Sequence, residues 1–446
     1  MKANLRKFLA ALYVVVFLVV LYFSNAVYRS ISAANTVNRS KEAPYNDDLE
    51  FFKKDLPRLH PNLFYKYSKT DYYNKLDYLS KNQSEYSIDD MRLEIMKLTA
   101  SIEDGHTTAY VKSSKYFPFS ATWFDDNSLR ITAVTKDHKK YLGYRISKVN
   151  NIPIDDVLKK IDAVTPKESA NWLKSKSPKN LRNYELLKVL KIAKDDTITM
   201  TLEDFSNNTF DVRFKAINKY AFKKTVFLDL LYNPKNVPVA PKKANKNYWH
   251  AYDKENKIFY FKYKSCMDAA TAKSIGESQI SYSSNINLYF NSLIKDFNSS
   301  DAEKFIIDLR DNAGGSPKLI KYLIANLAAD PKFKNIADKN NRLFIFTNES
   351  TFSAGVFAGM DFKKSFPNSK IVGTSTGGLK TVFSNPKTKV LKNTNMYLSY
   401  ATDIYPNSSS IDRTPLIPDI ESLMNLRDAL IGIDYDYKLV KDSEIN

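Results

Sequence analysis

The chain has 446 residues, 43% of them apolar and 26% charged, which fits a soluble globular body of two or three domains. The net charge of +18 comes from lysines spread along the whole chain. There is no Lys/Arg block and no nucleic-acid motif, so we expect no nucleic-acid partner. The single cysteine, Cys266, excludes an intramolecular disulfide. It follows a strand-like run and is more typical of a buried small side chain than of a catalytic thiol.

Residues 1–27 predict a signal anchor or transmembrane helix. Lys2, Arg6 and Lys7 precede an apolar run from Phe8 to Phe23. With the residues that follow it, the run reaches the length of about 20 residues that a bilayer span needs. Basic residues before such a run place the N-terminus in the cytoplasm. The alternative is a signal peptide cleaved near Ala26. Both readings predict a body outside the cytoplasm, at the cell membrane or secreted.

The body divides by composition and periodicity. Apolar stripes at helical spacing predict a helical N-terminal domain, and runs of alternating and β-branched residues predict a β-rich domain after it. From about residue 255 the pattern changes to alternating strands and helices, which is typical of an α/β domain with a largely parallel sheet. The expected boundaries are a linker at 28–45, the helical domain at 46–108, the β-rich domain at 109–232 and the α/β domain at 248–436.

In the β-rich domain, strands are expected at 129–134, 143–149 and 197–202, with helices at 154–162 and 182–192. In the α/β domain, strands are expected at 257–262, 304–309, 342–347, 369–373 and 395–401, with helices at 284–298, 316–329 and 353–365. Functional groups in such sheets lie on the loops at strand ends.

Three segments at such ends carry groups suited to acyl transfer. Ser353 stands at the start of a predicted helix, where unpaired backbone N–H groups can hold a developing oxyanion. The pair Gly314-Gly315 can bring another N–H close, because no side chain obstructs it. His106, in a turn after a predicted helix, can take the proton of the serine. A carboxylate is then needed to orient the histidine.

Each feature also has a purely structural interpretation. Ser353 can cap its helix, the glycine pair can be a plain turn, and His106 can be a structural histidine. Of the other histidines, His250 is the rival base. No histidine pair has the spacing of metal ligands, so neither a metal nor a cofactor is expected.

Taken together and in order, the motifs resemble the C-terminal-processing (tail-specific) serine peptidase family, also called the tricorn-core-like family. Five segments carry the resemblance: Ile102-Glu-Asp-Gly-His-Thr107, Ile306-Ile-Asp-Leu-Arg-Asp-Asn-Ala-Gly-Gly315, Asn348-Glu-Ser-Thr-Phe-Ser-Ala354, Ile371-Val-Gly-Thr-Ser-Thr-Gly-Gly378 and Pro418-Asp-Ile420. The resemblance implies a serine endopeptidase that cleaves exported proteins or peptides.

The resemblance implies that Ser353 is the nucleophile and that the N–H of Ala354, with one from Gly314 or Gly315, forms the oxyanion hole. One branch of the family uses a lysine as base, and that position here is Leu379, with Lys380 one residue later. The other branch uses a histidine, which His106 matches.

The histidine-using branch implies a distant acid, which falls on Asp412. This position typically holds glutamate in that branch, and Asp403 and Glu421 are further candidates. Gly105 stands where the branch has a serine. A catalytically silent, membrane-anchored relative that binds peptides or other ligands is the alternative function, and a Ser353–Lys380 dyad is a third. The segment Tyr141 to Pro153 resembles the family's PDZ-like module, which binds chain ends by strand addition.

Overall fold

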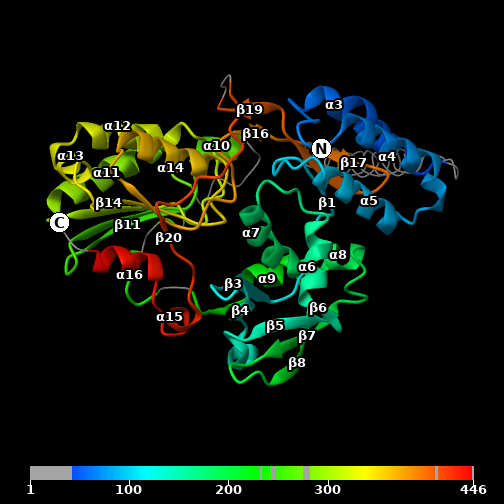
Figure 1. Ribbon diagram of the computed structural model, residues 1–446, viewed down its shortest axis with the longest axis horizontal. Helices are drawn as coiled ribbons and strands as arrows, with labels where there is room; N and C mark the ends of the chain where they lie inside the picture. The colour runs from blue at the N-terminus through cyan, green and yellow to red at the C-terminus, as the bar shows by residue number, and fades with distance from the viewer. Residues whose placement is uncertain are drawn as a thin grey trace, which may run out of the picture.

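The computed structural model describes residues 43–231, 234–242, 245, 247–274, 282–406 and 410–443. The predicted anchor at 1–27 and nearly all of the predicted linker lie outside the described residues. Within the part that is described, no helix has the length and apolar character needed to cross a bilayer. The described chain has a mixed α/β fold in three regions (Figure 1).

The C-terminal region is built on a six-stranded sheet of order β11-β12-β13-β14-β15-β20. All neighbouring strands are parallel except β11, which is antiparallel to β12. The predicted strands and helices are present with ends shifted by up to three residues. The strands are β11 (Tyr248–Asp253), β12 (Ile258–Tyr263), β13 (Lys304–Asp308), β14 (Leu343–Thr347), β15 (Lys370–Gly373) and β20 (Ile420–Glu421).

Helices cover both faces of this sheet because its central strands are apolar on both sides. Phe259, Phe305 and Ile345 face α11 (Ile286–Ser299), α12 (Leu319–Ala329), α13 (Pro331–Ala337) and α14 (Ala354–Ser365). Tyr260 and Ile306 face α16 (Tyr435–Asp442) on the other side. Figure 1 shows these two helical layers on opposite sides of the strands. Short helices α10 (Ala269–Ser274) and α15 (Leu426–Leu430) lie outside the layers.

The middle region contains a seven-stranded antiparallel sheet whose main path is β10-β4-β5-β7-β8. Its strands are β3 (Phe119–Trp123), β4 (Leu129–Val134), β5 (Arg145–Val149), β6 (Ile152–Pro153), β7 (Thr197–Glu203), β8 (Thr209–Lys215) and β10 (Leu228–Asp229). A small pair, β2 (Lys115–Tyr116) and β9 (Ile217–Asn218), and helix α9 (Lys219–Lys224) adjoin it.

Three helices interrupt this sheet, whereas the sequence predicted two. The predicted helices correspond to α6 (Ile154–Asp162) and the shorter α8 (Tyr184–Val189). The additional helix, α7 (Ala170–Leu181), contains Pro178 and several lysines and serines, so it has neither a clear apolar stripe nor good propensity. It begins at Ser169, whose Oγ accepts a hydrogen bond from the N–H of Trp172. Tertiary contacts therefore stabilise a helix that its local sequence does not indicate.

The N-terminal region is helical, as predicted. It comprises α2 (Asn46–Glu50), a π-helical turn (Phe51–Asp55), α3 (Leu56–Leu59), α4 (Lys69–Lys81) and α5 (Ile88–Ala100). The strand predicted at 395–401 is present as β18 (Met396–Tyr400), but its expected membership of the α/β sheet is wrong. It pairs with β1 (Thr108–Tyr110) and β17 (Lys387–Leu391). Met396 and Leu398 of β18 are buried in the core of the N-terminal and middle regions. This burial explains why β18 pairs with β1 and β17 rather than joining the α/β sheet.

Candidate active site

The nucleophile candidate Ser353 lies between β14 and α14 in an unusual backbone conformation. Its φ of 52° and ψ of −127° are sparsely populated for a residue with a side chain. Two hydrogen bonds hold the turn before Ser353 to the segment that follows β13. The N–H of Phe352 donates to the carbonyl of Asn312 at 2.8 Å, and Thr351 Oγ1 donates to the carbonyl of Leu309 at 3.0 Å. The half-buried hydroxyl makes no hydrogen bond with any described residue. The structure thus presents Ser353 on a strained strand-to-helix turn.

The glycine pair lies against this turn. Gly314 has a φ of 103°, and a Cβ atom there would lie 2.8 Å from Ser353 Cβ and 3.1 Å from the backbone nitrogen of Ala354. Only glycine leaves that space open. The N–H of Gly314 donates to Asn312 Oδ1 at 2.9 Å, whereas the N–H groups of Gly315 and Ala354 have no acceptor among the described residues. Of the three predicted oxyanion donors, Gly314 is thus the one whose N–H is already bonded.

His106 lies in the turn between α5 and β1 and is 11% exposed. Its carbonyl accepts a hydrogen bond from Ser399 Oγ at 2.9 Å, so the turn is held against β18, which pairs with β1. Its ring lies 4.8 Å from the ring of Phe352, the residue before Ser353. His106 and Ser353 are thus brought into one region, although no hydrogen bond joins them.

A buried carboxylate lies beside the imidazole. Asp104 Oδ1 accepts a hydrogen bond from the backbone N–H of His106 at 3.0 Å and lies 3.9 Å from its Nδ1. This Nδ1 has no hydrogen-bond partner among the described residues. Burial lowers the pKa of His106 by disfavouring the imidazolium. Asp104 opposes that shift, and the charges of Lys176 and Arg413 add to it. The imidazole is therefore neutral at neutral pH and able to accept a proton.

The acid predicted at Asp412 lies elsewhere in this structure. Its Oδ1 accepts from Thr414, its Oδ2 lies 3.4 Å from Lys380 Nζ, and half of its side chain is exposed. Asp412 makes no hydrogen bond or ion pair with His106. The next residue, Arg413, turns inward instead and donates to the carbonyl of Glu103 at 2.8 Å. The fallback residues Asp403 and Glu421 are exposed.

Glu168 also lies at the His106 turn and was missed in the sequence. It accepts a hydrogen bond from the N–H of Gly105 and lies 3.9 Å from Arg413 Nη2. A Cβ at Gly105 would lie 2.9 Å from Glu168 Oε2, so the glycine gives the carboxyl room to approach. Burial, reinforced by the charge of Asp104, raises the pKa of Glu168 to about 8 against the opposing charge of Arg413.

Helix α7 lies over the nucleophile turn. The ring of Trp172 stacks on Phe352 at 3.9 Å, so that Phe352 has Trp172 and His106 as ring neighbours. Asn171 Nδ2 donates to the carbonyl of Ser375 at 2.7 Å. Three further contacts join the helix to the C-terminal region: Ser169 Oγ to the carbonyl of Gly377, Ser175 Oγ to Ser350 Oγ, and Lys179 Nζ to Ser350 Oγ. The middle region is thereby docked at the candidate site.

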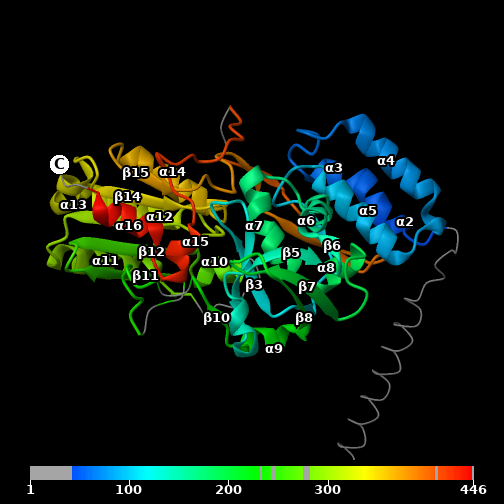
Figure 2. The same ribbon diagram turned by 60° about the horizontal axis from the view of Figure 1, so that its bottom comes forward.

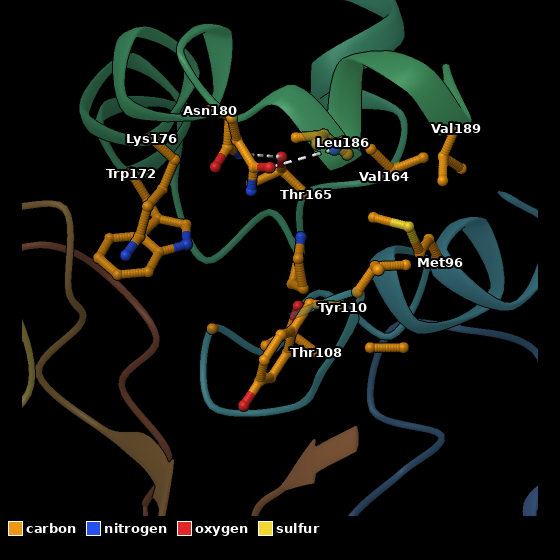
Figure 3. A pocket seen from close by; sticks show the side chains of 15 residues that line it. Met96, Thr108, Tyr110, Val164, Thr165, Trp172, Lys176, Asn180, Leu186 and Val189 are labelled. Atoms are coloured by element: carbon orange, nitrogen blue, oxygen red, sulfur yellow. Dashed lines mark hydrogen bonds between the residues drawn. The ribbon is translucent and has the colours of Figure 1, made fainter. Parts of the chain in front are cut away.

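A cavity of about 200 Å³ opens beside the His106 turn, between the N-terminal and middle regions. Gly105 and Thr108 of the His106 turn line it, as do Trp172 and Lys176 of α7. Figure 3 shows Trp172 and Lys176 at one end of the cavity, with Met96 and Val189 at the other. The cavity therefore adjoins the turn that carries His106.

The rival catalytic groups are engaged elsewhere. Lys380 Nζ bonds Thr414 Oγ1 at 3.1 Å and pairs with Asp412. His250, on the edge strand β11, is bonded to Tyr289 and Asp296. Cys266 is buried against the glycine pair, and burial raises the pKa of its thiol to about 12. Among the described residues there is no group of histidines, cysteines and carboxylates that could hold a metal.

Residues 278–422, which include Ser353 and the glycine pair, match the sequence description of peptidase family S41. The matched segment is an S41 peptidase domain. The protein is accordingly a serine-type peptidase. A comparison with curated protein sequences finds no match.

Two solved structures have a fold similar to that of this chain. The structure of mature CPAF complexed with lactacystin has a TM-score of 0.61 at 13% identity, over 89% of this chain and 96% of that chain. Mature CPAF alone has a TM-score of 0.58 at 14% identity, over 88% of this chain and 96% of that chain. At such low identity the likeness concerns the fold, and it extends over most of this chain.

Proposed function

We propose that this S41 peptidase hydrolyses peptide bonds through an acyl-enzyme on Ser353, with His106 as general base. The observation that carries the proposal is the convergence of three remote segments. Gly314 contacts the Ser353–Ala354 turn, and the ring of Phe352 brings that turn against His106. The strained conformation of Ser353 supports the same role, since such strain concentrates at functional sites.

In the proposed reaction His106 Nε2 takes the proton from Ser353 Oγ as the oxygen attacks the substrate carbonyl. The oxyanion that forms is held by the N–H groups of Ala354 and Gly315. The peptide C–N bond breaks when the imidazolium returns the proton to the leaving amine. Water, activated by the same imidazole, then releases the acyl group. Nε2 is the reacting nitrogen because Nδ1 faces Asp104.

Two carboxylates are candidates for orienting His106. The family resemblance points to Asp412, whereas the distances favour Asp104, whose Oδ1 lies 3.9 Å from Nδ1. A short movement of the imidazole would close that gap, and catalytic hydrogen bonds are often long in an empty enzyme. Binding of substrate must also bring His106 to Ser353, since the two make no hydrogen bond here.

The proposal includes exported protein or peptide substrates, a PDZ-like role for the middle region, and anchoring by residues 1–27. The basic and apolar N-terminal sequence supports export, and the antiparallel sheet around β4, β5 and β7 is compatible with the PDZ-like assignment. The alternative is a catalytically silent relative that only binds its ligand. The absence of a Ser353–His106 hydrogen bond favours that alternative.

Covalent labelling separates these functions. A fluorophosphonate probe should label the full chain, and Ser353→Ala should abolish labelling. The matched control is Ser350→Ala, three residues away, whose hydroxyl bonds Ser175 and Lys179 and lies before the turn that carries Ser353. Unlabelled wild-type protein, or labelling that persists in Ser353→Ala, contradicts the proposed nucleophile.

A further inference from the structure

Lys176 is a half-buried cation without a counter-ion at the edge of the candidate site. Its Nζ lies 3.9 Å above the ring of Trp172, and no carboxylate of the described residues lies within ion-pair distance. The other two lysines of α7 are either exposed or hydrogen-bonded. Lys174 is exposed, and Lys179 donates to Ser350 and Ser175. Removing a charge from water without a partner costs free energy, so an anion arriving at Lys176 would be stabilised.

The charge state of Lys176 agrees with this environment. Burial, with a smaller effect of the positive charge of Lys179, lowers the pKa of Lys176 to about 8. The amine is therefore mostly protonated at pH 7 and loses its charge as the pH rises through that value. An anion bound beside it would favour the protonated form.

The rest of the cavity is lined by apolar and uncharged polar residues, the polar ones including Thr165 and Asn180. Its apolar wall is formed by Met96, Ala109, Val111, Val164, Leu186 and Val189. Lys176 is the one charged residue lining it among the described residues, and Figure 3 places it with Trp172 at the end opposite Met96 and Val189. A matching occupant has an apolar stem and one carboxylate.

We propose that this cavity is a substrate-recognition pocket for a carboxylate-bearing part of the peptide, with Lys176 as its specificity-determining cation. The inference rests on the proposed peptidase function, because Gly105 and Trp172 place the pocket next to His106 and Phe352. The carboxylate belongs either to an acidic side chain or to the end of a peptide chain. Both present the same group to the ammonium.

The test measures kcat/KM of the full chain on a peptide that it cleaves. Each position is changed in turn to Glu or Gln, and each peptide is made with a free or amidated C-terminus. At one position we expect kcat/KM to be about tenfold higher with Glu than with Gln, or with a free C-terminus than with an amidated one. This ratio is the size of one charge-assisted hydrogen bond. Lys176→Met should remove this preference, and Lys176→Glu should reverse it towards a Lys-containing peptide. Lys174→Met, on the same helix, should leave it intact.

The pH dependence gives a second readout. The preference for the carboxylate should fade between pH 7 and 9 in the wild type but persist in Lys176→Arg, because a guanidinium stays charged over this range. An equal response of Lys174→Met and Lys176→Met, or no carboxylate preference in a peptide that is cleaved, overturns the inference.

The inference can fail separately from the proposed function. If no peptide is cleaved, the peptidase proposal fails while binding remains measurable. Fluorescence anisotropy of the same labelled peptides with full-chain Ser353→Ala then reports the affinity directly. Tighter binding of the carboxylate peptides that is lost in Ser353→Ala/Lys176→Met supports the pocket, and equal binding to both proteins overturns it.

Discussion

His60 Nε2 lies 3.1 Å from Asp104 Oδ2, and both side chains are fully buried. The backbone N–H of Asn62 donates to His60 Nδ1 at 3.1 Å, which leaves the ring proton on Nε2 to be donated to Asp104. One carboxylate oxygen is thus held by His60 while the other faces His106. The helical N-terminal region therefore supports the carboxylate beside the candidate base.

Substitution of His60 tests this support. His60→Leu should remove the donor to Asp104 and lower the free energy of unfolding by about 3 kcal/mol, as expected when a buried charge loses its partner. His60→Gln should retain most of the stability, because its amide nitrogen can occupy the position of Nε2. Urea unfolding of the full-length variants measures the difference. Equal destabilisation by Leu and Gln would show that the loss of ring packing, not of the donor, matters.

The α/β region was predictable because its signals are local. Apolar strands such as Phe305 to Leu309 and the helices between them have clear periodicity, and the nucleophile and glycine turns follow them directly. Sequence order and a family resemblance were enough to nominate Ser353, Ala354 and His106. The structure brings all three to one region.

What the sequence did not predict depends on contacts between remote segments. Glu168 is one of 49 aspartates and glutamates in the chain, and no motif marks it. Its position beside Gly105 follows from the docking of α7 against the C-terminal region. The contact between His60 and Asp104 joins residues 44 positions apart, so no local pattern in the sequence indicates it. The pairing of β18 with β1 also depends on a remote contact, because it buries Met396 and Leu398 in the core of the N-terminal and middle regions.

A pair of variants identifies the acid that orients His106. We expect Asp104→Asn to lower kcat at least about a hundredfold, as loss of an orienting carboxylate does in related triads. Asp412→Asn should stay within about threefold of the wild type, because Asp412 is half exposed and bonded to Thr414 and Lys380. Steady-state kinetics, with circular dichroism to confirm folding, distinguishes them. The opposite order of effects would favour the acid implied by the family resemblance.

Glu168 makes stability depend on pH. Its folded-state pKa of about 8 lies above the ordinary value of 4.5, so the unfolded chain releases the proton first as the pH rises. Its contribution to stability is therefore complete below about pH 4.5 and is lost progressively up to about pH 8. Glu168→Gln, which still accepts from Gly105, should match the wild type at pH 4 and be more stable than it at pH 8. Urea unfolding at both pH values measures this, and an equal difference at both would contradict it.

The pH profile of kcat/KM reports the protonation of His106. Burial and the charges of Lys176 and Arg413 lower its pKa against the opposing effect of Asp104, so the acidic limb should lie below the ordinary value of 6.5. Lys176→Met removes one of the two cations that disfavour the imidazolium. Its acidic limb should therefore move to higher pH, whereas Lys174→Met should not shift it. A peptide without carboxylates is the substrate of choice, since its binding does not itself depend on Lys176. An unchanged acidic limb in Lys176→Met would mean that another group controls the reaction.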